Sequence, residues 1–457
     1  MRAAVQTIED QYDVVVVGGG PAGTTCGHLL AKKGHKVLIV EKEEHPRFRI
    51  GESLLPHSTK VWDELGLFDV FENGPYARKY GAWFDFADGA EPEYFYFGLD
   101  NPKRGDWAWN VERSWFDQIL WNAAMDAGAQ GVQNTEVTRF HVDGEGASAR
   151  ISGVDLTTAD GQAKTVTARL TIDASGRLSL IGKLLGLRTP DPRLNMVAMY
   201  AHYEGSTLVT GKDAGTIGII ALADGWAWAI PFADGKISVG FVVRNTAFAA
   251  RVKGRTPDDV FLDYVAETPA VHDRLGPDAV LSRAVETTAN FSFRCSAVAG
   301  DGWVLAGDAG AFVDPVFSSG VHLAMEGSRR LARDADRALR KGSGLVPASA
   351  FGRYRRAQQR ALKVFTRFIY KWYEDEYRWA FMRPPPNSAP VQFIKRKILR
   401  VLAGEVFQPW KVVPFMWTLE MMAKVNAAGV RRMNPQLPAP GEAPQVIPGR
   451  VAPAADA

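Results

Sequence analysis

The sequence predicts an α/β fold in which a mixed β-sheet is inserted into a domain that begins with a βαβ unit, with a helical C-terminal extension. Three observations predict this fold. The N-terminal stretch alternates strand, glycine turn, helix and strand; Val-, Ile- and Thr-rich segments follow in the middle; and the pattern after Gly307 is mostly helical. At 457 residues, 46% of them hydrophobic, the chain can form two or three structural units.

The βαβ unit is the segment YDVVVVGGGPAGTTCGHLLAKKGHKVLIVEK. Gly18, Gly20 and Gly23 form GxGxxG between strand and helix, where they allow a tight turn, close approach to a pyrophosphate and close helix packing. Glu41 ends the next strand, where its carboxylate can accept hydrogen bonds from a ribose. The unit therefore predicts a Rossmann-like dinucleotide site, with the helix N-terminus facing the pyrophosphate.

The middle of the chain contains three strand-like segments, RISGVDLTT, KTVTARLTIDAS and GKISVGFVVRN, which we expect to form a sheet separate from the nucleotide domain. The C-terminal tail is rich in proline and alanine and has little to bury, so we expect it to be disordered. The predicted boundaries are 11–340 for a discontinuous nucleotide-binding domain, 79–105 and 186–282 for the inserted substrate sheet, 341–433 for the helical extension and 434–457 for the tail.

Composition excludes several classes of function. With 54 basic and 51 acidic residues the chain is nearly neutral, so we expect no nucleic-acid partner. Cys26 and Cys295 lie far apart without a CxxC pattern, which argues against disulfides and metal sites. No signal peptide is evident and no apolar run reaches the roughly 18 residues of a membrane span. We expect a cytoplasmic protein with no membrane span and no metal.

The stretch WAWAIP places Trp226 and Trp228 one residue apart. Alternate residues of a strand point to the same face, so both indoles should shield something together. Alternatively, they only fill the core of a β-sheet, as aromatics at strand spacing commonly do.

The segment around Gly307 and Asp308, an apolar strand opening into a loop and helix, resembles the second flavin fingerprint of the aromatic hydroxylase class of FAD enzymes. In that class the aspartate contacts the ribityl chain and the following helix points its N-terminus at the isoalloxazine. DASGR at 173–177 and VERSWFD, with Arg113, match further elements. The resemblance covers most of residues 12–330 and implies FAD.

Three further segments resemble the flavin-dependent halogenases. PRFRIGESLLP looks like the loop that covers the flavin, and WAWAIP matches the family's WxWxIP at all four specified positions. The third match is to FxxPxxSxG, through Phe312, Pro315, Ser318 and Gly320. Related reductases and hydroxylases share the GES loop and the helix after Asp308. The WxWxIP and FxxPxxSxG motifs are therefore more specific for the halogenases.

This resemblance implies a site and a reaction. The implied cofactor-binding residues are Gly18, Gly20, Ala22, Gly23, Glu41, Arg49, Gly51, Glu52, Ser53, Arg113, Asp308, Pro315 and Gly320. Reduced FAD and O2 would give a flavin hydroperoxide that chloride or bromide attacks, and the resulting hypohalous acid would halogenate an electron-rich aromatic compound. The halide would bind at Ser318, Ser319 and Gly320, where backbone N–H groups near a helix start supply positive potential. Trp226 and Trp228 would separate flavin from substrate.

The family also uses one lysine, as a haloamine carrier or as a hydrogen-bond donor to hypohalous acid. Lys79, in YARKYGAWFDF, occupies its place, and an amine beside an aromatic-rich strand can be partly desolvated. Arg78 is adjacent, a plain surface lysine remains an alternative, and Lys60 is a less favoured substitute.

Phe317 stands where tryptophan halogenases carry a glutamate, so the sequence resembles the branch that acts on phenols, pyrroles or carrier-bound acyl groups. The C-terminal helices look like that branch's extension, which partly covers the active-site mouth. Free substrates and substrates tethered to an acyl or peptidyl carrier protein both remain open. No second nucleotide fingerprint is evident, so we expect a separate NAD(P)H-dependent flavin reductase.

Three other readings remain. An FAD-dependent aromatic monooxygenase would share every cofactor motif, and a flavin-dependent isoprenoid reductase would share the GES and Asp308 regions without needing WAWAIP or Lys79. A flavin-binding protein without turnover would show a damaged flavin site, but the motif residues are intact. His57 and His322 have no metal-ligand spacing, so we expect packing or capping roles, with a role of His322 in orienting the cofactor as an alternative.

Overall fold

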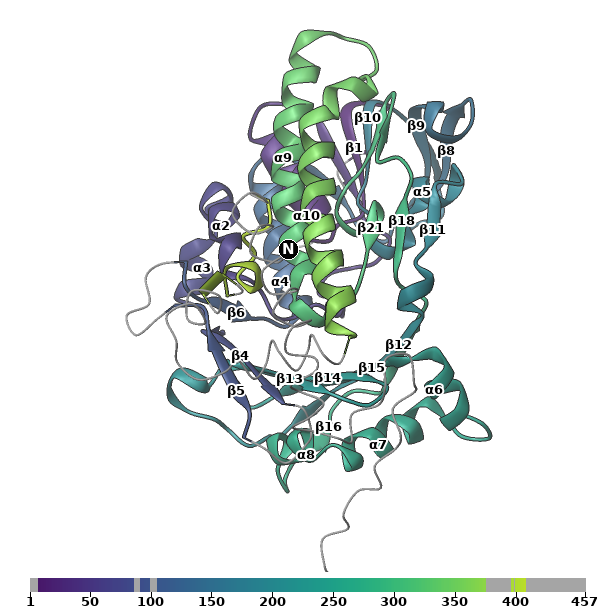
Figure 1. Cartoon of the computed structure of the whole chain (residues 1–457). Helices are drawn as coiled ribbons and strands as arrows, with labels where there is room; N and C mark the ends of the chain where they lie inside the picture. The colour runs from purple at the N-terminus through teal and green to yellow at the C-terminus, as the bar shows by residue number, and fades with distance from the viewer. Residues whose placement is uncertain (1–6, 86–90, 99–104, 375–395, 398, 408–457) are drawn as a thin grey trace, which may run out of the picture.

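The computed structural model describes residues 7–85, 91–98, 105–374, 396–397 and 399–407. Two large β-sheets lie at opposite ends of the molecule in Figure 1. The long helices α9 (Ser319–Lys341) and α10 (Gly352–Trp372) run side by side along the first sheet, with the end of α10 directed at the second. The predicted disordered tail at 434–457 and much of the predicted helical extension lie outside the described residues.

The first sheet is built on parallel strands. Its order is β19-β20-β10-β1-β2-β7, with β9 and β8 continuing from β10, and β1 pairs in parallel with both β2 and β10. Its strands are β1 (Gln11–Val17), β2 (Val37–Val40), β7 (Gln130–Val132), β8 (Glu136–Asp143), β9 (Arg150–Thr157), β10 (Ala163–Asp173), β19 (Ala299–Gly300) and β20 (Trp303–Leu305). Continuous runs such as VVVV and VLIV form these strands because both faces of the sheet are covered.

The two faces of β1 pack against different layers. Val14 and Val16 belong to the core that contains α1 (Pro21–Ala31), whereas Val15 and Val17 pack against β9. The same core also takes in α2 (Thr59–Leu65), α3 (Phe68–Glu72), α4 (Arg113–Asp126) and α9.

One expectation from the sequence is wrong. RISGVDLTT and KTVTARLTIDAS form β9 and β10, which belong to the first sheet and not to a separate one. Strand β10 pairs directly with β1, placing Val14 opposite Leu170. Strand periodicity shows only that a segment is extended, and the choice of partner strand depends on the chain's long-range path.

The second sheet includes the third segment, GKISVGFVVRN, as β15. Its order is β16-β12-β15-β14-β13-β4-β5, and β17 pairs with β12. Its strands are β4 (Gly81–Asp85), β5 (Glu93–Tyr96), β12 (Met196–Glu204), β13 (Ile217–Ala221), β14 (Gly225–Pro231), β15 (Ile237–Arg244), β16 (Val280–Leu281) and β17 (Glu286–Ala289).

Strand β14 separates two cores. Trp226 and Trp228 lie on the face toward α10, and Ala227 and Ala229 face the opposite core with α7 (Pro257–Glu267). The alternation predicted for WAWAIP is therefore confirmed. The end of α10 reaches this face of the second sheet, while α6 (Asn245–Arg251), α7 and α8 (Pro269–Leu275) lie at the other face (Figure 1).

Smaller elements join the two sheets. β3 (Ala77–Lys79) pairs with β6 (Ala108–Asn110), and the second small sheet has the order β11-β18-β21. The remaining bounds are β11 (Arg188–Pro190), β18 (Phe293–Cys295), β21 (Ala311–Phe312) and α5 (Leu180–Leu184).

Gly225 allows close pairing at the start of the tryptophan strand. A Cβ there would lie 1.9 Å from the carbonyl oxygen of Val242 in β15. We expect Gly225→Ala to lower the free energy of unfolding by about 1–3 kcal/mol, because the neighbouring backbone must move to make room. Urea unfolding measures the change. Gly342→Ala is the control, since a Cβ at Gly342 meets nothing within 4 Å, and equal losses in both variants would contradict this account.

Candidate active site

The turn between β1 and α1 leaves no room for side chains. A Cβ at Gly18, whose φ is +110°, would lie 2.4 Å from the carbonyl oxygen of Ala174, and a Cβ at Gly23 would lie 1.9 Å from the carbonyl oxygen of Gly18. Around Gly20 the space is open, with Arg47 Nη2 the nearest atom, 3.9 Å from an added Cβ. An open backbone at a helix N-terminus beside a guanidinium fits a pyrophosphate.

Glu41 is buried at the end of β2. Its Oε2 accepts hydrogen bonds from Gly19 N at 2.8 Å and Arg47 Nη2 at 2.9 Å. Burial alone would raise the pKa of Glu41, but the hydrogen bond and charge of Arg47 outweigh burial and lower that pKa. The carboxylate is therefore ionised, as an acceptor for ribose hydroxyls must be.

Arg47 and Arg113 share one buried carboxylate. Arg47 Nη1 lies 2.8 Å from Asp117 Oδ2, and Arg113 donates to both oxygens of Asp117 at 2.8 and 2.9 Å. Arg113 also donates to the carbonyl oxygen of Ile50 at 2.7 Å, which fixes the start of the GES loop. Burial opposes ionisation of Asp117, but the two guanidinium groups prevail and lower its pKa.

The structure places the two arginines of PRFR differently. Arg49, the predicted cofactor ligand, has a side chain that is 39% exposed and pairs with Glu43 at 2.7 Å, whereas Arg47 is buried beside the phosphate turn. Sequence reasoning missed Arg47. Both arginines follow the same strand at a spacing of two, and only the distant partner Asp117 distinguishes them.

The GES loop also carries a buried hydrogen bond between a carboxylate and a histidine. Glu52 Oε1 accepts a hydrogen bond from His202 Nε2 at 2.7 Å, a partner on β12 that the sequence did not indicate. Burial lowers the pKa of His202, but the hydrogen bond and charge of Glu52 outweigh burial and raise it. Gly51 has φ +106°, which favours glycine at the bend before Glu52.

Asp308 lies in a tight junction between the two fingerprints. A Cβ at Gly307 would lie 3.1 Å from the Cβ atoms of both Ala22 on α1 and Ala324 on α9. Burial raises the pKa of Asp308 to about 6, against the opposing charge of Arg177. The carboxyl group makes no hydrogen bond to the described residues, so it is available to a ribityl hydroxyl.

The FxxPxxSxG segment turns directly into α9. A short 3-10 turn, Pro315–Phe317, leads to Ser318, which has φ +54°, and α9 then begins at Ser319. No side chain caps this helix end, so backbone N–H groups including that of Gly320 remain free of such a bond. The predicted halide residues therefore come together at the start of a long helix, where the dipole favours an anion.

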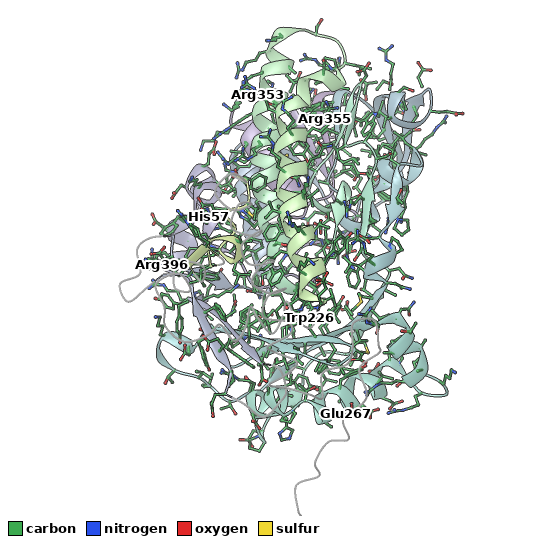
Figure 2. The ribbon with its side chains drawn as sticks, viewed as in Figure 1. His57, Trp226, Glu267, Arg353, Arg355 and Arg396 are labelled. Atoms are coloured by element: carbon green, nitrogen blue, oxygen red, sulfur yellow. The ribbon has the colours of Figure 1, made fainter. Side chains whose placement is uncertain are left out.

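The two tryptophans form one indole layer. Trp226 and Trp228 are 2% and 5% exposed, and their ring centroids lie 5.7 Å apart at 43°. Trp228 Nε1 donates to Ser238 Oγ and Trp226 Nε1 to Tyr373 Oη, both at 3.1 Å. Figure 2 shows Trp226 where the end of α10 meets the second sheet.

Lys79 is buried, with 1% of its surface exposed. Its Nζ donates to the carbonyl oxygen of Leu54 at 3.2 Å and lies 5.3 Å from the Phe97 ring centroid. Burial lowers the pKa of Lys79 to about 7. In contrast, Lys60 is exposed, and the exposed Arg78 pairs with Glu72.

Strand pairing brings Lys79 and the GES loop together. Lys79 lies opposite Ala108, and Asn110 on the same strand lies opposite Ser53. Directly opposed residues point to the same face, so Lys79, Asn110 and Ser53 share one face of this ladder. Ser53 Oγ and Asn110 Oδ1 are buried without a hydrogen-bond partner among the described residues, which leaves polar capacity beside the amine.

His322 connects α9 to the segment at 399–407. Its Nδ1 lies 3.0 Å from Ser58 Oγ and its Nε2 lies 2.9 Å from the carbonyl oxygen of Gly404. Burial lowers the pKa of His322 to about 4. The backbone N–H of His57 donates to Ala403, so both histidines contact this segment.

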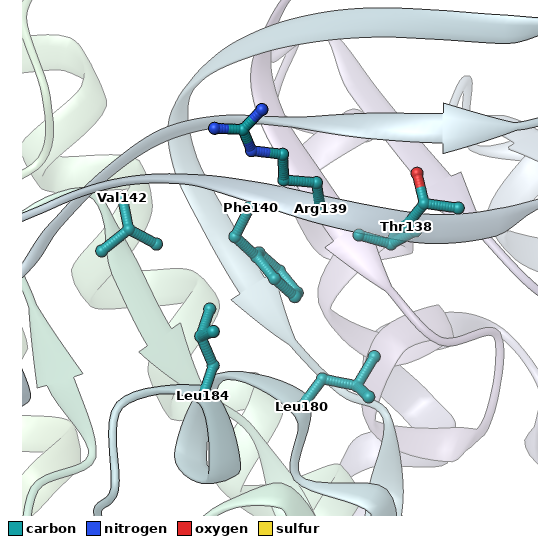
Figure 3. A pocket seen from close by; sticks show the side chains of 7 residues that line it. Thr138, Arg139, Phe140, Val142, Leu180 and Leu184 are labelled. Carbon is teal, nitrogen blue, oxygen red and sulfur yellow. The ribbon is translucent and has the colours of Figure 1, made fainter.

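A surface groove lies on the first sheet, away from these groups. It has a volume of about 540 Å³, and Figure 3 shows Phe140 pointing from β8 toward Leu180 and Leu184. The lining residues are Val137, Thr138, Arg139, Phe140, Val142, Leu180 and Leu184. None of the predicted site residues lines this groove.

Two absences hold for the part of the chain that the structure describes. No group of three or more His, Cys, Asp or Glu residues is arranged to hold a metal ion. No helix in that part is long and apolar enough to cross a membrane.

The phosphate turn, the ionised Glu41 and the Asp308 junction define an FAD-binding protein, and residues 11–346 match the family described as FAD binding domain. Among curated proteins, the chain is 30% identical over 445 residues to the 1H-pyrrole-2-carbonyl-(peptidyl-carrier protein) chlorinase of Pseudomonas fluorescens, covering 92% of this chain and 95% of that protein. It is 31% identical to the tryptophan 2-halogenase of Chondromyces crocatus, covering 79% and 67%. The chain belongs to the flavin-dependent halogenases, whose cofactor is FAD and whose co-substrates are halide and O2.

Solved structures agree with this assignment. The myxobacterial chondrochloren halogenase CndH matches with a TM-score of 0.74 and 28% identity over 91% of this chain and 98% of that chain. The flavin-dependent brominase Bmp2 matches with a TM-score of 0.77 and 26% identity over 91% and 99%. A flavoprotein/dehydrogenase from Cytophaga hutchinsonii matches with a TM-score of 0.78 and 30% identity over 91% and 99%. The predicted α/β fold with an FAD-binding domain is confirmed.

We expect Glu41→Gln to raise the Kd for FAD about tenfold, because a neutral amide replaces the charged acceptor for the ribose hydroxyls. Fluorescence titration of the apoprotein with FAD measures the change. Glu43→Gln is the matched control, since Glu43 is partly exposed and pairs with Arg49. An equal Kd in the two variants would argue against Glu41 as the ribose acceptor.

Proposed function

We propose that this halogenase makes hypohalous acid from halide, O2 and reduced FAD, and uses it to halogenate an electron-rich aromatic compound by electrophilic substitution. The observation that carries this proposal is Lys79, a buried amine with one carbonyl partner at 3.2 Å and a pKa lowered to about 7. A lysine with no paired carboxylate among the described residues is costly to bury, so a chemical role accounts for its position.

The residues around the phosphate turn fit FAD in a defined way. Gly18, Gly20 and Gly23 would admit the pyrophosphate, Glu41 the ribose and Asp308 the ribityl chain. Bound there in its reduced form, FAD supplies with O2 the two-electron oxidant for the halide. The ring system would be bordered by Gly51, Glu52, Ser53, Arg113 and Pro315. Arg47, beside Gly20 and Glu41, would lie at the pyrophosphate end.

Trp226 and Trp228 would keep the organic substrate from the flavin side. Two buried indoles on one strand face form a continuous apolar surface, and both N–H groups are bonded, so neither ring is free to rotate without losing a hydrogen bond. Halide would enter at the start of α9, near Ser318, Ser319 and Gly320, and only a small oxidant would pass the indole layer.

Lys79 would then transfer the halogen. The neutral amine attacks the halogen of hypohalous acid, an N–halogen bond forms, and the oxygen leaves as water with one amine proton. The aromatic ring next gives an electron pair to that halogen, and the ring proton returns to the amine nitrogen. A lysine that only donates a hydrogen bond to hypohalous acid would instead act best as the charged ammonium, which a pKa of about 7 leaves in the minority above neutral pH.

We infer a phenolic or pyrrolic substrate, free or tethered to an acyl or peptidyl carrier protein. Phe317 supplies no carboxylate for deprotonating a ring intermediate, which suits substrates that activate their own ring. The similarity to a protein named as a chlorinase of a carrier-bound pyrrole supports the same class. Reduced FAD would come from a separate NAD(P)H-dependent flavin reductase.

The test is an aerobic assay with a flavin reductase, NADH, FAD and bromide or chloride against phenolic and pyrrolic probes, each free and carrier-bound. We expect a halogenated product that depends on halide and on the reductase. Hydroxylated product that ignores halide would instead indicate an aromatic monooxygenase. Rapid NADPH oxidation by the purified protein without the reductase would show that no separate flavin reductase is needed.

Lys79 also predicts a pH dependence. Because the neutral amine is the reactive form, single-turnover halogenation should be constant above about pH 8 and fall to about one tenth at pH 6, with a midpoint near the pKa of about 7. Flavin oxidation should not follow this curve. A rate that instead rises as the pH falls would indicate a charged hydrogen-bond donor.

Two variants test the role of Lys79, each replacing one lysine with alanine. Lys79→Ala should abolish halogenation while flavin oxidation continues, and Lys60→Ala should leave both unchanged because Lys60 is exposed on α2. If Lys60→Ala lost halogenation while Lys79→Ala kept it, Lys60 and not Lys79 would be the lysine that transfers the halogen.

A further inference from the structure

The last turns of α10 dock onto the loop that leads to the halide residues. Phe317 of that loop lies 4.7 Å from Phe368 and 5.6 Å from Trp372, measured between ring centroids. Trp372 also reaches β4, with 5.8 Å between its ring and that of Phe84. The phenylalanine at position 317 is therefore an apolar anchor for this helix.

Tyr373, the residue directly after Trp372 at the end of α10, makes a polar connection. Tyr373 Oη donates to Asp314 Oδ2 at 2.8 Å and accepts a hydrogen bond from Trp226 Nε1 at 3.1 Å. Asp314 Oδ1 also accepts the backbone N–H of Val316 at 3.0 Å. One phenol thus links the indole layer on β14 to the loop that begins at Asp314.

Chemistry fixes the direction of these bonds. An indole N–H can only donate, and an ionised carboxylate can only accept. Burial raises the pKa of Asp314 to about 6, so above that pH the single hydroxyl proton of Tyr373 points to Asp314 and its oxygen faces Trp226. Burial and the neighbouring Asp314 raise the pKa of Tyr373, which keeps the phenol protonated. Removing the hydroxyl would leave a buried indole N–H and a carboxylate oxygen each without this partner.

The network spans the two parts of the site that the reaction needs. Asp314 caps the turn Pro315–Phe317, and Ser318 and Ser319 follow directly. Trp226 is the indole that packs against Trp228, with the two rings tilted at 43°. A shift of Tyr373 would therefore move both the turn that leads to Ser318 and the indole layer of Trp226 and Trp228.

We propose that Tyr373 is a positioning residue whose hydroxyl holds Trp226 and Asp314 in register, so that the end of α10 closes the barrier around the oxidant. This inference rests on the proposed function, because it assigns Tyr373 the task of retaining hypohalous acid.

The experiment compares Tyr373→Phe with Tyr370→Phe. Tyr370 is a matched control: it lies on the same helix, and its hydroxyl also bonds a carboxylate, Asp191, and receives a bond from Arg294 at 2.8 Å. A bulk scavenger of hypohalous acid reports oxidant released per flavin oxidised. We expect release to rise about fivefold in Tyr373→Phe, as for the loss of one hydrogen bond, with unchanged flavin oxidation. Tyr370→Phe should behave as wild type.

A second readout needs no flavin. The indole Nε1–H signal of Trp226 in a ¹H–¹⁵N spectrum, assigned by its loss in Trp226→Phe, should shift in Tyr373→Phe and stay in place in Tyr370→Phe. Wild-type oxidant retention in Tyr373→Phe with an unmoved signal would overturn the proposal. If Tyr373→Phe does not fold, hydrogen exchange of the indole N–H groups in the wild-type protein is measured instead. Exchange at Trp226 as fast as at the exposed Trp115 would overturn the proposal, and much slower exchange at Trp226 would support it.

Failure of this proposal can be told from failure of the proposed function. A wild-type protein that makes no halogenated product removes the halogenation mechanism, whereas the indole signal still reports whether Tyr373 holds Trp226. Halogenation in wild type with equal release from both phenylalanine variants removes only the role of Tyr373.

Discussion

The Lys79 amine is held inside the protein against one backbone carbonyl and one aromatic ring, and the cost of burying a charge there is met by lowering its pKa to about 7. The surrounding architecture serves this placement. Strand β3 places the lysine beside the GES loop, and the indole layer on β14 packs with α10 in one apolar core. The amine is thereby kept apart from bulk water.

Around the dinucleotide turn, in contrast, buried charged groups keep their charge because each has a partner of opposite sign. Charges there are paired in a chain from Glu41 through Arg47 and Asp117 to Arg113, so the carboxylates stay ionised despite burial. Arg113 extends the chain to the backbone of the GES loop. The ionisation of Glu41 and the placement of the loop before Ser53 therefore depend on one set of ion pairs.

Helix α10 and the residue after it connect the indole layer to the loop before α9. Aromatic contacts of Phe317 give it an apolar seat, and Tyr373 adds directional bonds to a carboxylate and an indole. Apolar packing alone tolerates small shifts, whereas hydrogen bonds specify orientation. This combination is what an extension needs if it is to determine the geometry of a site and not only to shield it.

Local spacing in the sequence determined the βαβ unit, the glycine turn and the shared face of Trp226 and Trp228, because helix, strand and turn signals act over a few neighbouring residues. The FAD assignment came from the resemblance of several short motifs to a known family. Only the tertiary structure decided that β9 and β10 join the first sheet, and that Arg47 lies inside while Arg49 pairs at the surface. The tertiary structure alone also identified His202 as the partner of Glu52 and Tyr373 as the partner of Trp226. The two residues of these pairs lie 150 and 147 positions apart in the sequence. Periodicity carries no information about which distant segments meet, since that depends on how the whole chain packs.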